Sequence, residues 1–195
     1  MKRVFDILFS LCGIVILLPV FILILVLILL NDGWPVLYRQ VRVGQCNQDF
    51  TLIKFRTMRK NSDLLGLLTV GGRDPRVTAI GYYLRKYKLD ELPQLFNVLM
   101  GQMSLVGPRP EVRKYVQLYT DEQLKILNVK PGITDYASLE YYNENELLAK
   151  SANPEKTYID EVMPAKLNLN KKYVEEAGVL IDLKIIFLTI KKILA

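Results

Sequence analysis

Residues 11–30 read LCGIVILLPVFILILVLILL, and none of these side chains carries a charge. Twenty residues of α-helix rise about 30 Å, which matches the hydrocarbon thickness of a bilayer. A cleaved signal peptide would have a shorter apolar region, of about 7–15 residues, followed by a small-residue cleavage site. The next residues, Asn31 to Pro35, offer no such site. The stretch therefore predicts a membrane anchor that stays on the protein.

Pro19 lies near the middle of this run. It cannot donate a hydrogen bond to the carbonyl of Val15, and its ring crowds that carbonyl, so a kink or break is expected. The helix could cross the membrane once with a kink, or it could be re-entrant and leave through the leaflet it entered. Lys2 and Arg3 precede the run, and six lysines and arginines follow between positions 39 and 60. Basic flanks tend to stay on the cytoplasmic side, so the charges favour the re-entrant form.

A second apolar segment, Val179 to Leu194, ends the chain, and Asp182, Lys184 and Lys191 are among its few polar residues. This pattern predicts a helix. Two placements stay open: a helix of the protein core, or a helix in the membrane interface whose lysines face anionic headgroups.

The remaining sequence predicts a mostly helical α+β fold. We expect residues 1–33 to form a membrane helix broken at Pro19, in the re-entrant form that the charges favour. We expect residues 34–195 to form a compact cytoplasmic domain with interfacial amphipathic helices around it. Val36–Val43 and Phe50–Phe55 alternate weakly between apolar and polar residues around a polar turn, which predicts a small β-hairpin. Asn61–Asp74 is expected to be a loop. Helices are expected at Thr78–Lys86, Leu89–Leu99, Glu111–Asn128 and Pro154–Glu176, the last with a break at Pro164.

The helix expected at Leu89–Leu99 has the clearest periodicity, because apolar residues recur at 92, 95, 96 and 99. Asp90 is a suitable N-cap, Pro93 is tolerated in a first turn, and Gly101 is a plausible stop.

Composition excludes several classes of site. The 195 residues contain no histidine, which excludes a Ser-His-Asp triad, a Cys-His pair and any His-ligated metal. Cys12 and Cys46 form no disulfide framework or zinc spacing, so a reducing compartment is expected. The 26 basic and 20 acidic residues leave a net charge of +6, which suits an anionic partner.

Asp90 and Glu91 are adjacent carboxylates at a predicted helix N-terminus. As a purely structural feature they are a cap followed by a favourable first-turn acid. However, Arg85 lies just upstream, and Arg109 lies between two prolines that restrict its guanidinium. Carboxylates among cations suit phosphate chemistry with Mg²⁺, and a carboxylate can also attack phosphorus. No Walker A loop, kinase motif or dinucleotide fingerprint is present.

With these motifs in place, the chain resembles the bacterial sugar transferases, more specifically the small, single-domain monotopic polyprenyl-phosphate phosphoglycosyl transferases. The resemblance covers nearly the whole chain, and the order and number of the matching pieces make it specific. They are KRVFD at 2–6, VG at 43–44, KFRTM at 54–58, DPRVT at 74–78, LDELPQLFNVL at 89–99, MSLVGPRP at 103–110 and PGIT at 131–134.

The resemblance implies a two-step reaction that initiates membrane-bound glycan assembly. Asp90 matches the family's nucleophile, which attacks the β-phosphorus of a UDP-sugar, releases UMP and keeps a phosphosugar. Polyprenyl (undecaprenyl) phosphate then takes the phosphosugar. Glu91 matches the second acid, which binds Mg²⁺ together with Asp90, while Lys54, Arg85 and Arg109 match cations that bind phosphates. The implied location is the cytoplasmic face of the bacterial inner membrane, in contact with its lipids.

The sequence departs from the family pattern at three places. The family's anchor breaks at a Ser-Pro pair, and here the pair is Leu18-Pro19. Gln102 replaces the usual Asp before Met-Ser. After PGIT most relatives have Gly, whereas Asp135 begins a different segment that runs to Glu146. The acidic pair is untouched by these changes. They leave open which donor sugar is used and how the nucleotide is bound, and a subfamily loop with a different local fold would also explain them.

Two other functional classes were weighed. An inactive membrane-bound scaffold or binding subunit of a glycan-assembly complex would be expected to lack the acidic pair or the phosphate-binding arginines, and both are present. Nucleic-acid binding is suggested by charge alone, without a motif or a basic–aromatic cluster, so no nucleic-acid partner is expected. The sequence does not determine the oligomeric state, and a homo-oligomer stays open.

Overall fold

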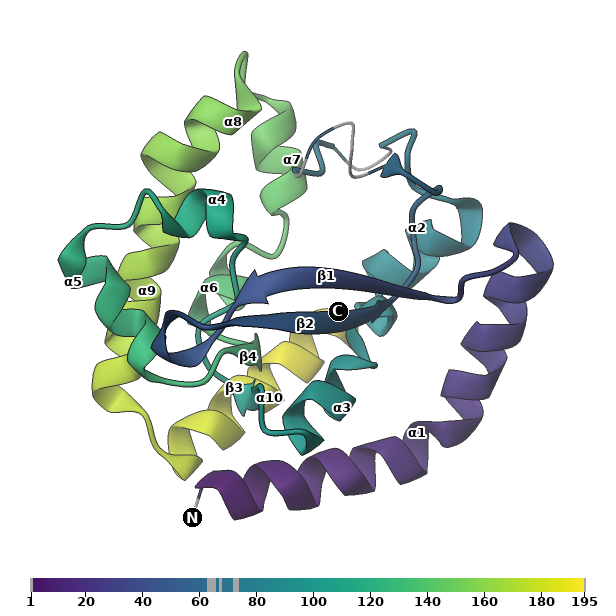
Figure 1. The fold of residues 1–195 in the computed structure, drawn as a ribbon, viewed down its shortest axis with the longest axis horizontal. Helices are drawn as coiled ribbons and strands as arrows, with labels where there is room; N and C mark the ends of the chain where they lie inside the picture. The colour runs from purple at the N-terminus through teal and green to yellow at the C-terminus, as the bar shows by residue number, and fades with distance from the viewer. Residues whose placement is uncertain (1, 63–65, 67, 72–73, 195) are drawn as a thin grey trace.

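The computed structural model describes residues 2–62, 66, 68–71 and 74–194. Helices dominate the described part of the chain, which also contains two small sheets (Figure 1). Strand β1 (Leu37–Val43) pairs antiparallel with β2 (Asp49–Phe55), which confirms the predicted hairpin; a short 3₁₀ turn, η1 (Gln45–Asn47), joins them. The second sheet pairs β3 (Ser104–Val106) in parallel with β4 (Gly132–Thr134). It was not predicted, because three-residue strands are too short to show an alternating pattern.

The apolar run forms helix α1 (Lys2–Asp32), which continues through Pro19. Figure 1 shows α1 as two arms joined by a sharp bend, as expected for a proline within a helix. In the described part of the chain, only α1 is long and apolar enough to cross a membrane. Most of its apolar side chains are exposed, including Val4, Leu8, Leu11, Val15, Ile16, Leu18, Ile22, Leu23 and Leu30.

The first turns of α1 are bonded to the body of the protein. The Lys2 ammonium donates to Asp182, 2.5 Å away, and to the carbonyl of Val106, 3.1 Å away. The buried carboxylate of Asp6 accepts hydrogen bonds from the Ser104 hydroxyl and the Leu105 amide, at 3.0 and 3.1 Å. These bonds tie the start of α1 to strand β3 and the C-terminal helix.

The last turn of α1 is bonded to the same body by Arg56. This residue is buried, although the sequence suggested only a basic flank. Its guanidinium donates to the carbonyls of Asp32 and Gly33, at 2.6 and 2.8 Å, and so satisfies acceptors that a helix leaves unpaired at its C-terminus. Both ends of α1 are therefore attached to one folded unit.

The region around the acidic pair differs in detail from the prediction. Helix α2 (Ala79–Lys86) is confirmed, with Thr78 as its N-cap. The helix predicted at Leu89–Leu99 is instead a 3₁₀ turn, η3 (Leu89–Glu91), followed by α3 (Gln94–Leu99). The role of Asp90 as an N-cap was wrong, because Lys88 starts η3 in a left-handed conformation with φ 55° and Pro93 precedes α3. Gly101, with φ 82°, follows the end of α3 as predicted.

The continuous helix predicted at Glu111–Asn128 was also wrong. The chain forms α4 (Arg113–Val116), α5 (Asp121–Leu124) and a 3₁₀ turn, η4 (Lys125–Asn128). The reason is a capping box, in which Thr120 and Gln123 bond to each other's backbone amides and start a new helix. The predicted loop at Asn61–Asp74 lies partly outside the described residues.

Pro154–Glu176 is helical throughout rather than interrupted. It comprises α8 (Pro154–Thr157), a π-helical turn, η5 (Tyr158–Val162), and α9 (Met163–Glu176). Pro164 falls in the first turn of α9, where a proline is tolerated, and the irregularity is the π turn just before it. The segment before α8 contains α6 (Tyr136–Glu140) and α7 (Glu144–Ala149).

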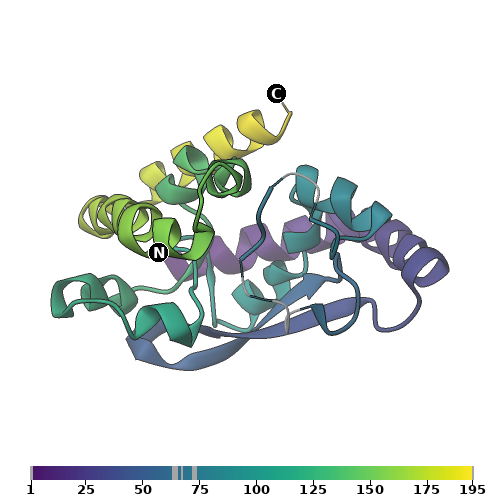
Figure 2. The same ribbon diagram turned by 90° about the horizontal axis from the view of Figure 1, so that it is seen from above.

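The C-terminal segment forms α10 (Val179–Leu194) as predicted, and one side of this helix packs into the protein core. Asp182 and Ile185 are buried in the core, whereas Leu180 and Phe187 are exposed. In Figure 2 the β1–β2 hairpin and the pair α9–α10 lie on opposite sides of the molecule.

Gly81 allows α2 to approach the segment after β2 that contains Thr57. A Cβ at position 81 would lie 2.1 Å from the Thr57 carbonyl oxygen. We expect Gly81→Ala to lower the free energy of unfolding by about 1–3 kcal/mol, although Ala is normally the better helix former. Thermal denaturation in detergent measures this. The control is Gly178→Ala, whose Cβ has no neighbour closer than 3.8 Å; equal stability of the two variants would contradict the close approach.

Candidate functional site

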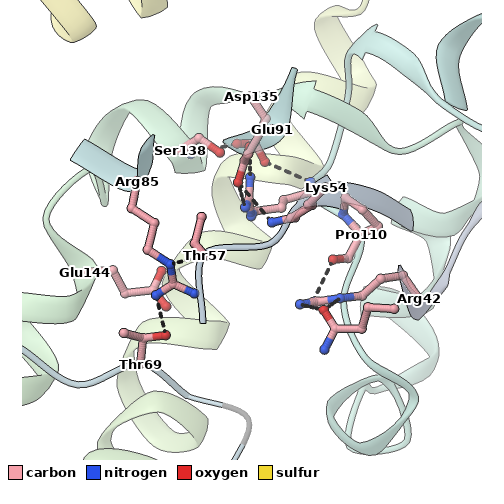
Figure 3. A network of polar contacts seen from close by, with 12 residues as sticks. Arg42, Lys54, Thr57, Thr69, Arg85, Glu91, Pro110, Asp135, Ser138 and Glu144 are labelled. Carbon is pink, nitrogen blue, oxygen red and sulfur yellow. Dashed lines mark hydrogen bonds and ion pairs between the residues drawn. The ribbon is translucent and has the colours of Figure 1, made fainter. Parts of the chain in front are cut away.

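All five site residues predicted from the sequence line one cleft of about 1040 Å³. Lys54 comes from β2, Arg85 from α2, Asp90 and Glu91 from η3, and Arg109 from the loop after β3. Figure 3 shows Lys54 facing Glu91, and Arg85 reaching toward two threonines. Three separate parts of the fold therefore bring their charges together at the acidic pair.

Glu91 is held by two cations. The Lys54 ammonium lies 3.1 Å from Oε1, and the Arg109 guanidinium binds both carboxylate oxygens. This is the two-point contact for which arginine is suited. Burial by itself would raise the pKa of Glu91, but Arg109 and Lys54 outweigh it and hold the pKa well below the ordinary value. Glu91 is therefore ionised and fixed in position.

Asp90 is placed differently from its neighbour. Its side chain is buried, and no hydrogen bond or ion pair is formed by its carboxylate within the described part of the chain. Burial, and secondarily the charge of Glu91, raise the pKa of Asp90, while Lys54, Arg85 and Lys88 oppose the rise. A carboxylate that is not engaged but faces several cations is available to react.

The cations of the cleft are themselves poorly hydrated. Burial lowers the pKa of Lys54 to about 8, although Glu91 opposes the shift. Burial likewise lowers the pKa of Lys88, which also lines the cleft and was not among the predicted site residues. Its position two residues before Asp90 was the available signal. An anionic ligand would strongly stabilise the charged form of these side chains.

Arg85 is oriented by hydroxyl groups rather than by carboxylates. It donates to the Thr57 hydroxyl at 2.9 Å and to the Thr69 hydroxyl at 3.0 Å. Burial lowers its pKa, against the influence of Asp90. Because its bonds are to neutral groups, its charge is not cancelled by a salt bridge and remains available to a ligand.

Asp135 supports Arg109. Its buried carboxylate accepts the Arg109 backbone amide at 3.1 Å and the Ser138 amide at 2.6 Å, the latter capping α6. Gln102 has a local role, because its side chain accepts a hydrogen bond from Asn97 at 2.7 Å. Sequence reasoning had not linked position 135 to the site.

Arg42 of β1 fixes the other side of the Arg109 turn, and this too was missed. Its guanidinium donates to the Pro110 carbonyl at 3.1 Å and forms an ion pair with Glu111, also at 3.1 Å. Arg42 had been interpreted only as part of the basic flank of the anchor. Alternation along the predicted strand gave no sign that this residue points into the cleft.

The residues present suit an ion that takes few ligands from protein. In the described part of the chain no three Cys, Asp or Glu residues gather as a metal cluster. Mg²⁺ typically uses one or two carboxylates and completes its shell with water and substrate phosphates. Asp90 is open for this role, whereas both oxygens of Glu91 are already in contact with cations.

Comparison with known proteins identifies the family of this chain. The family model described as "Bacterial sugar transferase" matches residues 1–195. The chain is 39% identical to the "Uncharacterized sugar transferase EpsL" of Bacillus subtilis, over 100% of this chain and 87% of the relative.

Two further relatives have names that state a reaction. One is the UDP-N-acetylgalactosamine-undecaprenyl-phosphate N-acetylgalactosaminephosphotransferase of Aeromonas hydrophila, 36% identical over 99% of this chain and 43% of the relative. The other is the UDP-glucose:undecaprenyl-phosphate glucose-1-phosphate transferase of Escherichia coli, 34% identical over 98% of this chain and 40% of the relative. The chain spans less than half the length of these two proteins. With a family model matched from end to end, the chain belongs to the bacterial sugar transferase family.

Proposed function

We propose that this protein transfers a sugar 1-phosphate from a UDP-sugar to polyprenyl phosphate, by way of a phosphosugar carried on Asp90. The observation that carries the proposal is the contrast between the two acids. Glu91 is held by Lys54 and Arg109, while the carboxylate of Asp90 has no hydrogen-bond partner in the described part of the chain. Only Asp90 can approach a phosphorus atom without breaking an ion pair.

In the first step an Asp90 carboxylate oxygen forms a bond to the β-phosphorus of the donor. The bond from that phosphorus to the bridging oxygen breaks, and UMP leaves with the electron pair. In the second step a phosphate oxygen of polyprenyl phosphate attacks the same phosphorus. The bond to Asp90 breaks, which restores the carboxylate and gives polyprenyl diphosphate-sugar.

The cations of the cleft complement the negative charge of the donor's diphosphate and of the leaving UMP. Arg85 is oriented by neutral hydroxyl groups, and Lys54 and Lys88 are partly desolvated. Arg109 offers a planar guanidinium on a turn braced by Asp135 and Arg42. We propose that these groups bind the diphosphate and stabilise the charge that develops on the leaving UMP.

We propose Mg²⁺ as the metal, with Asp90 and Glu91 as the acids that hold it. Glu91 would use those lone pairs of its carboxylate that Lys54 and Arg109 do not occupy. When bound, the ion would neutralise phosphate charge and act as a Lewis acid. Lys54 and Arg109 would keep Glu91 ionised and in place.

We further propose that α1 is re-entrant and that the rest of the chain lies on the cytoplasmic face of the inner membrane. Lys2 and Asp6 bind the folded body at one end of α1, and Arg56 binds at the other. A helix attached to one body at both ends fits an anchor that enters and leaves by a single leaflet. The exposed apolar side chains of α1 and α10 would then face lipid.

Labelling of single cysteines placed near each chain end, in sealed vesicles and with a membrane-impermeant thiol reagent, tests this topology. The background is a variant in which Cys12 and Cys46, both exposed, are replaced. We expect both ends to react from the same side of the membrane. Reaction from opposite sides would mean a crossing helix and would contradict the proposal.

The activity is tested by measuring UMP release from a panel of UDP-sugars in the presence of polyprenyl phosphate and Mg²⁺. We expect UMP to appear with at least one donor, and polyprenyl diphosphate-sugar to form in equal amount. An inactive scaffold would release no UMP with any donor. The intact acidic pair and the four cations around it favour the enzyme over the scaffold.

The pH dependence of this activity should report Lys54. Its pKa of about 8 means that the side chain is charged below this pH and neutral above it. We therefore expect kcat/KM for the UDP-sugar to fall as the pH rises through 8, by up to about tenfold per pH unit. In Lys54→Arg, which keeps its charge, the fall should move to higher pH. A wild-type profile that stays flat to about pH 10.4, where an ordinary lysine titrates, would contradict this role.

A further inference from the structure

Asn170 stands out among the residues of the cleft that the mechanism does not use. It lies on α9 and is 4% exposed, yet its Oδ1 has no hydrogen-bond partner within the described residues. Met163, Lys166 and Leu167 line the cleft from the same helix. Because positions 163, 166, 167 and 170 share one face of a helix, this face of α9 is directed toward the cleft.

Ser138 on α6 has the same property. It lines the cleft, and its Oγ is buried without a hydrogen-bond partner among the residues described. Helix α6 packs on α9, as shown by the rings of Tyr136 and Tyr173, whose centres are 6.3 Å apart. Two unsatisfied polar groups therefore line the cleft from two helices that touch.

This pair is connected to the phosphate-binding side of the cleft. The backbone amide of Ser138 donates to Asp135, and the same carboxylate accepts the backbone amide of Arg109. Figure 3 shows Ser138 beside Asp135 and on the same side of the site as Glu91. A group attached to a phosphate that Arg109 binds would therefore lie near Ser138.

The chemistry of the pair indicates a neutral ligand with several hydrogen-bonding groups. An unpaired amide oxygen needs a donor, and a hydroxyl can both donate and accept. The nearest charge on this face of α9, Lys166, is already paired with Glu144 at 2.6 Å. Buried polar groups left without partners are costly, so such groups in a cleft mark a place for water or ligand.

We propose that Asn170 and Ser138 are specificity-determining residues that bind hydroxyl or amide groups of the donor's sugar ring. The inference rests on the proposed function and adds the part of the site that reads the sugar.

The test compares Asn170→Leu with Asn168→Leu, since Asn168 is exposed on the same helix. Both are made in an Asp90→Asn background, which prevents turnover, and titrated with UDP-glucose, UDP-galactose, UDP-N-acetylgalactosamine and UDP. We expect Asn170→Leu to weaken binding of at least one UDP-sugar by about tenfold or more, because a site built around a polar contact loses most when that contact is removed. Binding of UDP and the behaviour of Asn168→Leu should stay within about twofold.

Ser138→Ala provides a second variant with little risk to folding, and it should weaken the same UDP-sugar in the same direction. Equal weakening of UDP and UDP-sugar in Asn170→Leu would overturn the proposal, because the contact would then be to the nucleotide or to the fold. Unchanged binding of every UDP-sugar in both variants would also overturn it, while wild-type UMP release would leave the proposed function standing. Absence of UMP release from the wild type would overturn both.

Discussion

Asp90→Asn is expected to lower UMP release by at least about 10³-fold, since loss of a nucleophile removes the reaction path rather than weakening it. The substitution keeps the size of the side chain, and no hydrogen bond within the described residues depends on the carboxylate. It also removes a buried acid whose pKa is raised by burial and by Glu91. The fold should therefore keep its stability, or gain slightly. The rate of UMP release, measured alongside the melting temperature, separates chemistry from folding.

The matched control is Asp121→Asn, an exposed carboxylate in the first turn of α5. It should release UMP at the wild-type rate. Turnover of Asp90→Asn comparable with that of Asp121→Asn would show that Asp90 is not the nucleophile.

Arg109→Leu is expected to be the next most damaging substitution, and it should lower both activity and stability. Removal of the guanidinium leaves Glu91 buried with Lys54 as its remaining ion-pair partner in the described part of the chain. Breaking a buried pair costs about 3–5 kcal/mol. A third of the Arg109 side chain is exposed, so we expect a smaller loss in the free energy of unfolding, about 2–3 kcal/mol. UMP release should fall by about 10²–10³-fold, as for loss of a group that stabilises developing charge.

Arg113→Leu is the control, because Arg113 forms its ion pair with Asp49 at the surface. It should change stability by no more than about 1 kcal/mol and leave UMP release intact. Arg109→Lys adds a second comparison, since lysine keeps the charge but cannot make the two-point contact with Glu91. Full activity in Arg109→Lys would mean that charge alone matters. Full activity in Arg109→Leu would remove Arg109 from the site.

Much of the fold follows from local patterns in the sequence. The hairpin β1–β2 and helices α2 and α10 were predicted within one or two residues of their observed bounds. The hairpin segments alternate weakly around a polar turn, and the helical segments have local apolar patterns. The break between α4 and α5 was missed, since it depends on the reciprocal bonds of Thr120 and Gln123. The sheet β3–β4 was missed because it joins segments far apart in the chain.

For the site, the sequence predicted the residues but not the contacts between them. Residue patterns selected Arg85, Asp90, Glu91 and Arg109, and the resemblance to a family added Lys54. The structure brings all five to one cleft. The sequence could not show that Glu91 is bound by two cations while Asp90 is not, because that difference depends on the turn η3. Nor could it assign Arg42 and Asp135, whose contacts with the turn around Arg109 join residues distant in sequence. Local propensity also gave Asp90 the wrong structural role, as a helix cap.

The central claim is that Asp90 carries the phosphosugar, and mass spectrometry of the intact protein tests it most directly. Wild-type protein is incubated with a UDP-sugar and Mg²⁺, without acceptor, and quenched. We predict a species heavier by one sugar phosphate, a modified peptide that contains Asp90, and loss of the added mass once polyprenyl phosphate is supplied. Asp90→Asn should never acquire it. Formation of polyprenyl diphosphate-sugar without any such adduct, or with the added mass on another residue, would contradict the claim.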